Sequence, residues 1–220
     1  MKFKWLIYLF IAFIIAFSIY FVMNKNNSNN NITNLITNTD TNINTVEENS
    51  GATTTEPVQN LSTLEDPIAE FKKRITLKPF GIYITPENSS VKPEKFTGYH
   101  TGVDVEYTDV SFEVPVYAAA DGTVVLSRFV SGYGGTTVIK IKIEDKDVLA
   151  LYGHLNPNQL LPINSKVKAG EKIGILGEGY TAETDFERKH LHFAIIKGNE
   201  INLKGYVNSK EELISWYNPL

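Results

Sequence analysis

The chain has 220 residues, which suits one domain with an additional segment better than two full domains. Its hydrophobic content of 42% is ordinary for a globular protein, and its net charge of −4 offers no basic field for binding nucleic acid. The lack of cysteine excludes disulfides and thiolate metal sites, so a bound metal would need histidine, aspartate or glutamate ligands.

The first residues predict a membrane anchor. Residues 1–4 contain two lysines, and residues 5–23 are uncharged and apolar over roughly 28 Å of helix, close to the thickness of a bilayer's hydrocarbon core. The alternative is a cleaved signal peptide, but the apolar run is long for one and no small-residue cleavage pattern follows it. Only one lysine, Lys25, occurs between this run and Lys72. We therefore expect a single transmembrane helix over residues 5–23, with residues 1–4 in the cytoplasm and the rest of the chain outside.

The composition changes twice after the anchor. Residues 24–63 are rich in asparagine, threonine and serine without an apolar period, which is typical of a flexible linker. Residues 64–76 form a short amphipathic lead-in, with Asp66 and Pro67 as a helix start signal. Residues 77–220 are then expected to form one domain.

This domain is expected to be mainly β. Residues 136–143 alternate between apolar and charged side chains, which is the period of a half-buried strand, and residues 144–147 predict a hairpin turn before the returning strand at 148–152. Residues 173–176 and 191–196 are further β-rich runs. Near the C-terminus, Ser209 is a candidate N-cap of one short helix that ends before Pro219. The sequence therefore predicts a small antiparallel β-sheet domain with a short C-terminal helix.

The four histidines lie in this domain, and three of them belong to two closely spaced pairs of candidate ligands. His100 and Asp104 are four residues apart, and His190 and His192 are two apart, so on extended chain each pair would share a face. His154 follows a β-rich run. Imidazole nitrogens and a carboxylate oxygen are good ligands for Zn²⁺, and three protein ligands would leave the fourth position open, as in catalytic zinc sites. A lone His-x-x-x-Asp pair is common by chance, whereas a lone His-x-His pair is a better signal, since adjacent in-phase imidazoles have few structural reasons.

Six segments, taken in order, resemble the lysostaphin and LytM-type zinc endopeptidases. The segments are His100-x-x-x-Asp104, residues 114–125, residues 132–135, residues 151–155, residues 167–174 and His190-x-His192 with Phe193. The resemblance covers about residues 78–220. It implies the small antiparallel β fold of that family, with loops that line a groove, and peptidoglycan stem or cross-bridge peptides as the substrate.

The resemblance also implies a role for each of the matching polar residues. His100, Asp104 and His192 match the family's three ligands to one Zn²⁺ ion. His154 and His190 match its two catalytic histidines that are not ligands. In such a site one imidazole would take the proton of the attacking water, and the other would stabilise the oxyanion or protonate the leaving amine.

Two loops depart from the family pattern. Residues 84–96 resemble an insertion ahead of His100. Residues 180–189, here called the charged loop, replace a segment that is often rich in glycine, serine and threonine. Its charges indicate either a solvated loop or a contact of Arg188 and Lys189 with substrate carboxylates.

Other functions are compatible with parts of this pattern. One is a catalytically silent scaffold that binds the cell wall or activates another wall hydrolase, and a second is a wall-glycan-binding module with a structural zinc. The complete set of matching residues favours the enzyme, because a structural zinc site is usually closed by four protein ligands. A serine hydrolase is not indicated, since no Gly-x-Ser-x-Gly sequence occurs.

Overall fold

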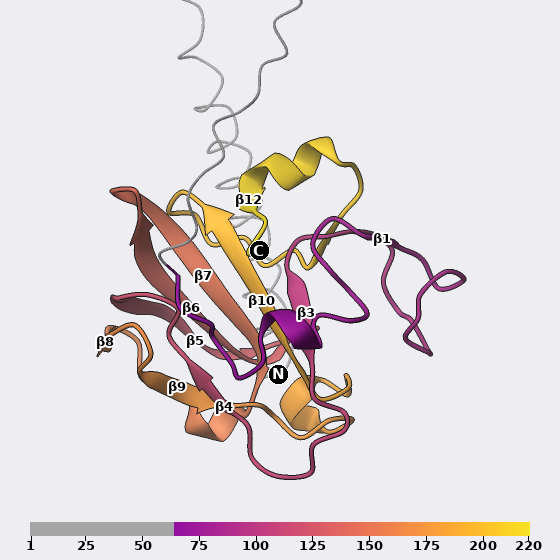
Figure 1. The fold of residues 1–220 in the computed structure, drawn as a ribbon, viewed down its shortest axis with the longest axis horizontal. Helices are drawn as coiled ribbons and strands as arrows, with labels where there is room; N and C mark the ends of the chain where they lie inside the picture. The colour runs from indigo at the N-terminus through magenta and orange to yellow at the C-terminus, as the bar shows by residue number, and fades with distance from the viewer. Residues whose placement is uncertain (1–63) are drawn as a thin grey trace, which may run out of the picture. The chain divides into compact units, whose positions relative to one another are not determined.

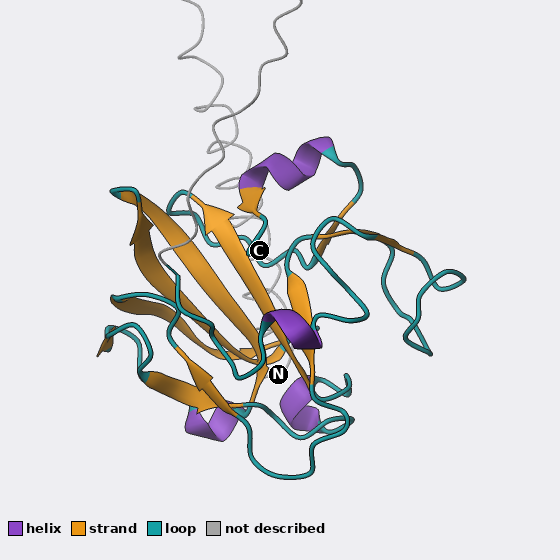
Figure 2. Ribbon diagram, viewed as in Figure 1, coloured by secondary structure: helices purple, strands orange, loops and turns teal. Residues whose placement is uncertain are grey.

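The computed structural model describes residues 64–220, so the expected cytoplasmic residues 1–4, transmembrane helix 5–23 and linker 24–63 lie outside the described residues. Among residues 64–220, no helix has the length and hydropathy needed to cross a membrane. Strands dominate this part of the chain and its helices are short 3-10 turns (Figure 2). The prediction of a mainly β, antiparallel domain is confirmed.

A seven-stranded antiparallel sheet forms the centre of the domain (Figure 1). Its strand order is β12-β10-β7-β6-β5-β8, and β3 pairs with β10 on the same edge as β12. The strands are β3 (Val103–Glu106), β5 (Gly122–Val130), β6 (Gly134–Ile143), β7 (Lys146–Leu155), β8 (Lys166–Val167), β10 (His190–Lys197) and β12 (Trp216–Tyr217).

Two small sheets and four 3-10 helices complete the domain. One small sheet has the order β1-β2-β11 and the other pairs β4 with β9. These strands are β1 (Tyr83–Ile84), β2 (Gly98–His100), β4 (Pro115–Tyr117), β9 (Lys172–Ile175) and β11 (Tyr206–Val207). The helices are η2 (Lys72–Arg74), η3 (Pro157–Gln159), η4 (Ala182–Thr184) and η5 (Glu211–Ser215).

The hairpin predicted around residue 145 is present between β6 and β7. Its two turn residues, Glu144 and Asp145, have φ angles of 49° and 62°. Two successive positive φ angles fit the type I′ turn, whose twist matches that of the flanking strands. The predicted alternation is present in the second half of β6, where Ile139 and Ile141 are buried and Lys142 is exposed, but residues 136–138 are all buried, so this part of the strand is not half-buried.

The C-terminal helix is present but differs from its predicted form. It is the five-residue 3-10 helix η5, and Lys210 precedes it without a side-chain cap, so the prediction of Ser209 as N-cap is wrong. The helix stays short because Trp216 leaves it to pair with Ile196 of β10.

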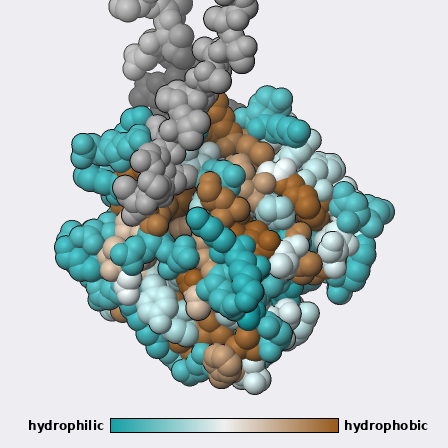
Figure 3. Space-filling view, in the orientation of Figure 1, coloured by the Kyte–Doolittle hydropathy of each residue, from teal (hydrophilic) through white to brown (hydrophobic). Residues whose placement is uncertain are grey.

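The central sheet is apolar on both faces. Along β10, Leu191 and Phe193 belong to one buried cluster, and Ala194 and Ile196 belong to a second. Successive strand residues point to opposite faces, so the two clusters lie on opposite sides of the sheet. Figure 3 shows hydrophobic residues interspersed with hydrophilic ones on one outer surface, as is normal for a domain of this size.

The lead-in, residues 64–76, packs on the first of these clusters. Ile68 and Phe71 are 1% and 3% exposed, and the Phe71 and Phe193 rings pack in a T-shaped arrangement with a centroid distance of 5.7 Å. The lead-in thus supports the strand that carries His192.

We expect Phe71→Ala to lower the free energy of unfolding by about 3–5 kcal/mol, because it removes a buried ring and leaves a cavity against Phe193. Thermal denaturation of the variant measures this loss. The matched control is Lys72→Ala, since Lys72 is the next residue and is exposed. Equal melting temperatures for the two variants would show that the lead-in does not support the core.

Candidate metal centre

Strand β10 carries His190 and His192 on one face. Between and after them, Leu191 and Phe193 are 0% and 1% exposed in the core. The in-phase arrangement inferred from the two-residue spacing is therefore confirmed. Both imidazoles are also buried, and they point into a cavity on the other side of the sheet from Leu191.

Asp104 reaches the same cavity from the neighbouring strand. In the antiparallel pairing of β3 with β10, Asp104 lies directly opposite His192. Residues directly opposite each other point to the same face of a sheet, so the register itself brings carboxylate and imidazole together. The Asp104 Oδ1 atom lies 3.0 Å from His192 Nδ1.

His100 joins this pair by a route that the sequence did not indicate. We expected His100 and Asp104 on one extended strand, but His100 ends β2 in one sheet and Asp104 lies in β3 of another. The chain bends at Thr101 and Gly102 between them. A Cβ atom at residue 102 would lie 2.6 Å from the Phe193 carbonyl oxygen and 2.8 Å from His192 Nε2, so this bend needs glycine.

The three side chains converge on a metal-sized triangle of donor atoms. His100 Nε2 lies 3.1 Å from His192 Nδ1 and 3.2 Å from Asp104 Oδ1, and the third edge is the 3.0 Å contact between His192 and Asp104. A tetrahedral Zn²⁺ with ligands at about 2.0–2.1 Å holds neighbouring ligand atoms about 3.3–3.4 Å apart. The triangle therefore fits one face of a zinc coordination tetrahedron.

The tautomer of His100 and the ionised state of Asp104 also favour a bound cation. His100 Nδ1 lies 3.3 Å from the Pro79 carbonyl oxygen, which can only accept, so Nδ1 carries the hydrogen and Nε2 presents a lone pair. Asp104 Oδ1 presents another lone pair beside it. Although burial alone would raise the pKa of Asp104, the surrounding imidazoles and Arg188 hold that pKa well below its usual value. A bound divalent cation would satisfy these converging lone pairs.

The two remaining histidines stand beside the triangle, and His190 Nε2 lies 3.5 Å from Asp104 Oδ2. His154 Nδ1 lies 3.2 Å from the Thr184 carbonyl oxygen and His190 Nδ1 lies 2.8 Å from the Arg188 carbonyl oxygen. Both Nδ1 atoms therefore donate, and both Nε2 atoms carry lone pairs. Burial lowers the pKa of His154 to about 3, and burial together with Arg188 lowers that of His190 well below its usual value. Both imidazoles are neutral at pH 7.

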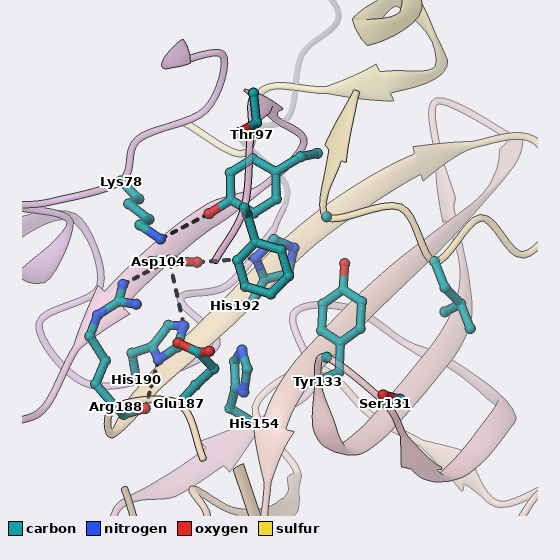
Figure 4. Close-up of a pocket in the computed structure, with 15 residues that line it drawn as sticks. Lys78, Thr97, Asp104, Ser131, Tyr133, His154, Glu187, Arg188, His190 and His192 are labelled. Carbon is teal, nitrogen blue, oxygen red and sulfur yellow. Dashed lines mark hydrogen bonds and ion pairs between the residues drawn. The ribbon is translucent and has the colours of Figure 1, made fainter. Parts of the chain in front are cut away.

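Four of the five predicted site residues, Asp104, His154, His190 and His192, line one cavity of about 320 Å³ (Figure 4), and His100 contacts two of them, His192 and Asp104. Its walls include three residues that were not singled out from the sequence: Lys78, Tyr133 and Tyr206. Tyr133 lies in the segment 132–135 that carries the family resemblance, so a signal for it existed. No sequence signal pointed to Lys78 or Tyr206, because their hydrogen bond of 3.0 Å joins residues that lie 128 positions apart.

At the C-terminal end of the charged loop, Arg188 and Lys189 are not exposed to solvent. They are also not free to bind substrate carboxylates. Both residues are buried, at 4% and 5% exposure. Arg188 pairs with Asp104 and Glu106, and Lys189 donates to the Phe112 carbonyl oxygen. Both interpretations of these two residues from sequence are wrong, because acidic partners inside the domain neutralise Arg188.

Two acidic residues connect the charged loop to its surroundings. Asp185 Oδ2 accepts a hydrogen bond of 2.6 Å from the Gly132 amide. Glu187 pairs at 2.9 Å with Lys95, which belongs to the insertion-like segment before His100. Phe96 and Glu187 both line the cavity, so the two loops that depart from the family pattern contribute neighbouring parts of its wall.

The fold and the site together define the class of protein. A small antiparallel β domain that directs two imidazoles and a carboxylate at one point, with two further neutral imidazoles alongside, has the donor set of a metallopeptidase. The sequence profile of peptidase family M23 matches residues 98–203. This match confirms, for residues 98–203, the resemblance to the lysostaphin and LytM-type peptidases that the sequence segments predicted.

The chain is also similar to several solved structures. The chain is similar to Csd3 of Helicobacter pylori, with 26% identity over 66% of this chain and a TM-score of 0.42, and it spans only 35% of that protein. It is similar to LytU, with 22% identity, coverage of 66% of this chain and 81% of that one, and a TM-score of 0.45. Lysostaphin from Staphylococcus simulans gives 20% identity, coverage of 70% and 51%, and a TM-score of 0.43. No curated protein matches the sequence.

Proposed function

We propose that this protein is a zinc-dependent endopeptidase that hydrolyses peptide bonds in the stem or cross-bridge peptides of peptidoglycan during cell-wall remodelling. One observation carries the proposal. His100, Asp104 and His192 form a triangle with the dimensions of a zinc site, and His154 and His190, which carry proton-accepting nitrogens, line the same cavity as Asp104 and His192. The match of residues 98–203 to peptidase family M23 supports peptide hydrolysis as the reaction.

In this proposal His100, Asp104 and His192 hold one Zn²⁺ ion. A bound zinc ion would supply a Lewis acid for the scissile carbonyl and lower the pKa of a water molecule to about 7. The hydrogen bond from His100 Nδ1 to the Pro79 carbonyl orients one of the ligands, as partners of metal-bound histidines commonly do.

His154 and His190 would move the protons. Each has its Nδ1 hydrogen fixed on a backbone carbonyl, so each offers Nε2 as a base toward the cavity. Their rings lie 4.2 Å apart between centroids, close enough to serve the same reacting group. One would accept the proton of the attacking water, and the other would stabilise the tetrahedral oxyanion or protonate the leaving amine.

Incubation of the purified full-length chain with purified peptidoglycan tests this proposal. Mass spectrometry of the released muropeptides should show one new amine and one new carboxyl terminus per cleavage, and a zinc chelator should stop their release. Intact peptidoglycan in the presence of the zinc-loaded protein would instead support the silent scaffold and contradict the endopeptidase. The masses of the fragments would identify the bond.

We also propose that residues 5–23 anchor the chain in the cell membrane, with the linker 24–63 and the domain outside the cell. The support is the sequence, in which Lys2 and Lys4 precede the uncharged apolar run. Protease added to cells stripped of their wall tests the orientation. A domain that survives intact while other external proteins are digested would refute it.

A further inference from the structure

Arg188 occupies an unusual position for an arginine. Its side chain is 4% exposed, and its guanidinium lies between two carboxylates from the neighbouring strand β3. Nε and Nη2 lie 2.8 Å and 2.6 Å from the two oxygens of Glu106, and Nη2 also lies 2.8 Å from Asp104 Oδ2. Figure 4 shows the contact with Asp104 on the side of the carboxylate away from His192.

Because Arg188 binds one oxygen of Asp104, the two oxygens of this carboxylate have different partners. Oδ1 faces the triangle with His100 and His192, and Oδ2 accepts from Arg188. A carboxylate held at one oxygen by a planar guanidinium cannot rotate freely about its terminal bond, so only Oδ1 remains for a cation. Glu106 in turn fixes the guanidinium through two parallel hydrogen bonds, and it does not itself reach the triangle.

We propose that Arg188 is a positioning residue for the metal centre: supported by Glu106, it orients Asp104 so that this ligand offers a single oxygen to Zn²⁺. This inference rests on the proposed function, since it concerns the same ion. The backbone of Arg188 contributes to the same site, because its carbonyl oxygen accepts the hydrogen of His190 Nδ1 at 2.8 Å. One residue of the charged loop thus orients a ligand and a neighbouring histidine.

A purely structural role for Arg188 makes a different prediction. On that account the guanidinium serves only to neutralise Glu106, which is 8% exposed and would otherwise be an unpaired buried charge. Replacing Glu106 together with Arg188 would then restore both the stability and the zinc affinity that replacement of Arg188 alone loses. A positioning role predicts that stability returns and zinc affinity does not.

The test compares Arg188→Met with the double variant Arg188→Met/Glu106→Met in the full-length chain. Zinc affinity is measured by competition with a chelator, and stability by thermal denaturation of the zinc-free proteins. We expect Arg188→Met to weaken zinc binding about 10–100-fold, as is typical for loss of a partner that orients a ligand, and to lower the melting temperature. The double variant should regain most of the melting temperature, because apolar residues commonly replace a buried ion pair without loss of stability.

Zinc affinity in the double variant decides between the two accounts. Affinity that stays at least about tenfold weaker than that of the parent chain supports positioning. Recovery of the parent affinity would overturn it, as would unchanged affinity in Arg188→Met. If Arg188→Met does not fold, the double variant alone still gives this result. Arg128→Met is the matched control, since Arg128 is exposed on β5, and it should bind zinc like the parent.

Failure of this inference is distinguishable from failure of the proposed function. A parent chain that binds no zinc and releases no muropeptides would refute the function. A parent chain that does both, with Arg188 variants of equal zinc affinity, would refute only the positioning role.

Discussion

Replacement of His154 is expected to abolish peptide hydrolysis while zinc stays bound. His154 Nε2 faces the cavity with a lone pair, but His154 contributes no atom to the triangle of donors. Loss of a general acid or base typically slows a reaction by about 10²–10⁴-fold. Rates of muropeptide release and zinc content, measured on the same preparation of His154→Ala, test both parts.

The backbone at His154 calls for a second variant. Its φ of 62° lies in the left-handed region, where alanine is strained and asparagine is tolerated. His154→Asn therefore removes the base without adding strain, and it should be as inactive as His154→Ala but more stable. Asn158→Ala, at an exposed position in the adjacent helix η3, is the control for nearby substitution. Normal cleavage by His154→Asn would rule out the assignment of His154.

The parts of the site that the sequence predicted well are those set by strand periodicity. The His190-Leu191-His192-Phe193 alternation fixes which side chains face the core, because a strand has a period of two. Family resemblance then supplied the distant partners. Pairing of β3 with β10 places Asp104 opposite His192, and this register depends on contacts between residues 88 positions apart that no local pattern encodes.

The parts that the sequence did not predict depend on tertiary burial. His100 and Asp104 meet across a bend rather than along a strand, because Gly102 lets the chain pass against the backbone of Phe193. Arg188 looked solvent-exposed because its neighbours in sequence are charged. Its burial is decided by Glu106, which lies 82 positions earlier in the chain. A charged residue can be assigned to a surface or an interior only once such partners are known.

Replacement of His192 is expected to remove zinc binding and activity together. His192 Nδ1 forms two of the three edges of the donor triangle, so His192→Ala leaves only His100 and Asp104 to hold the ion. We expect zinc affinity to fall by more than about 100-fold, beyond the usual effect of losing a residue that only orients a ligand. Activity should fall to background in the same variant.

Thermal denaturation with and without zinc measures this loss independently of catalysis. Zinc at about 1,000 times its dissociation constant would stabilise the parent chain by about 4 kcal/mol, which corresponds to roughly 10 °C for a domain of this size. His192→Ala should show no such shift. His190→Ala is the informative comparison, because it removes the same side chain two residues away on the same face of β10. Its melting temperature should still rise with zinc although it is inactive. A rise of the same size in His192→Ala would mean that His192 is not a ligand.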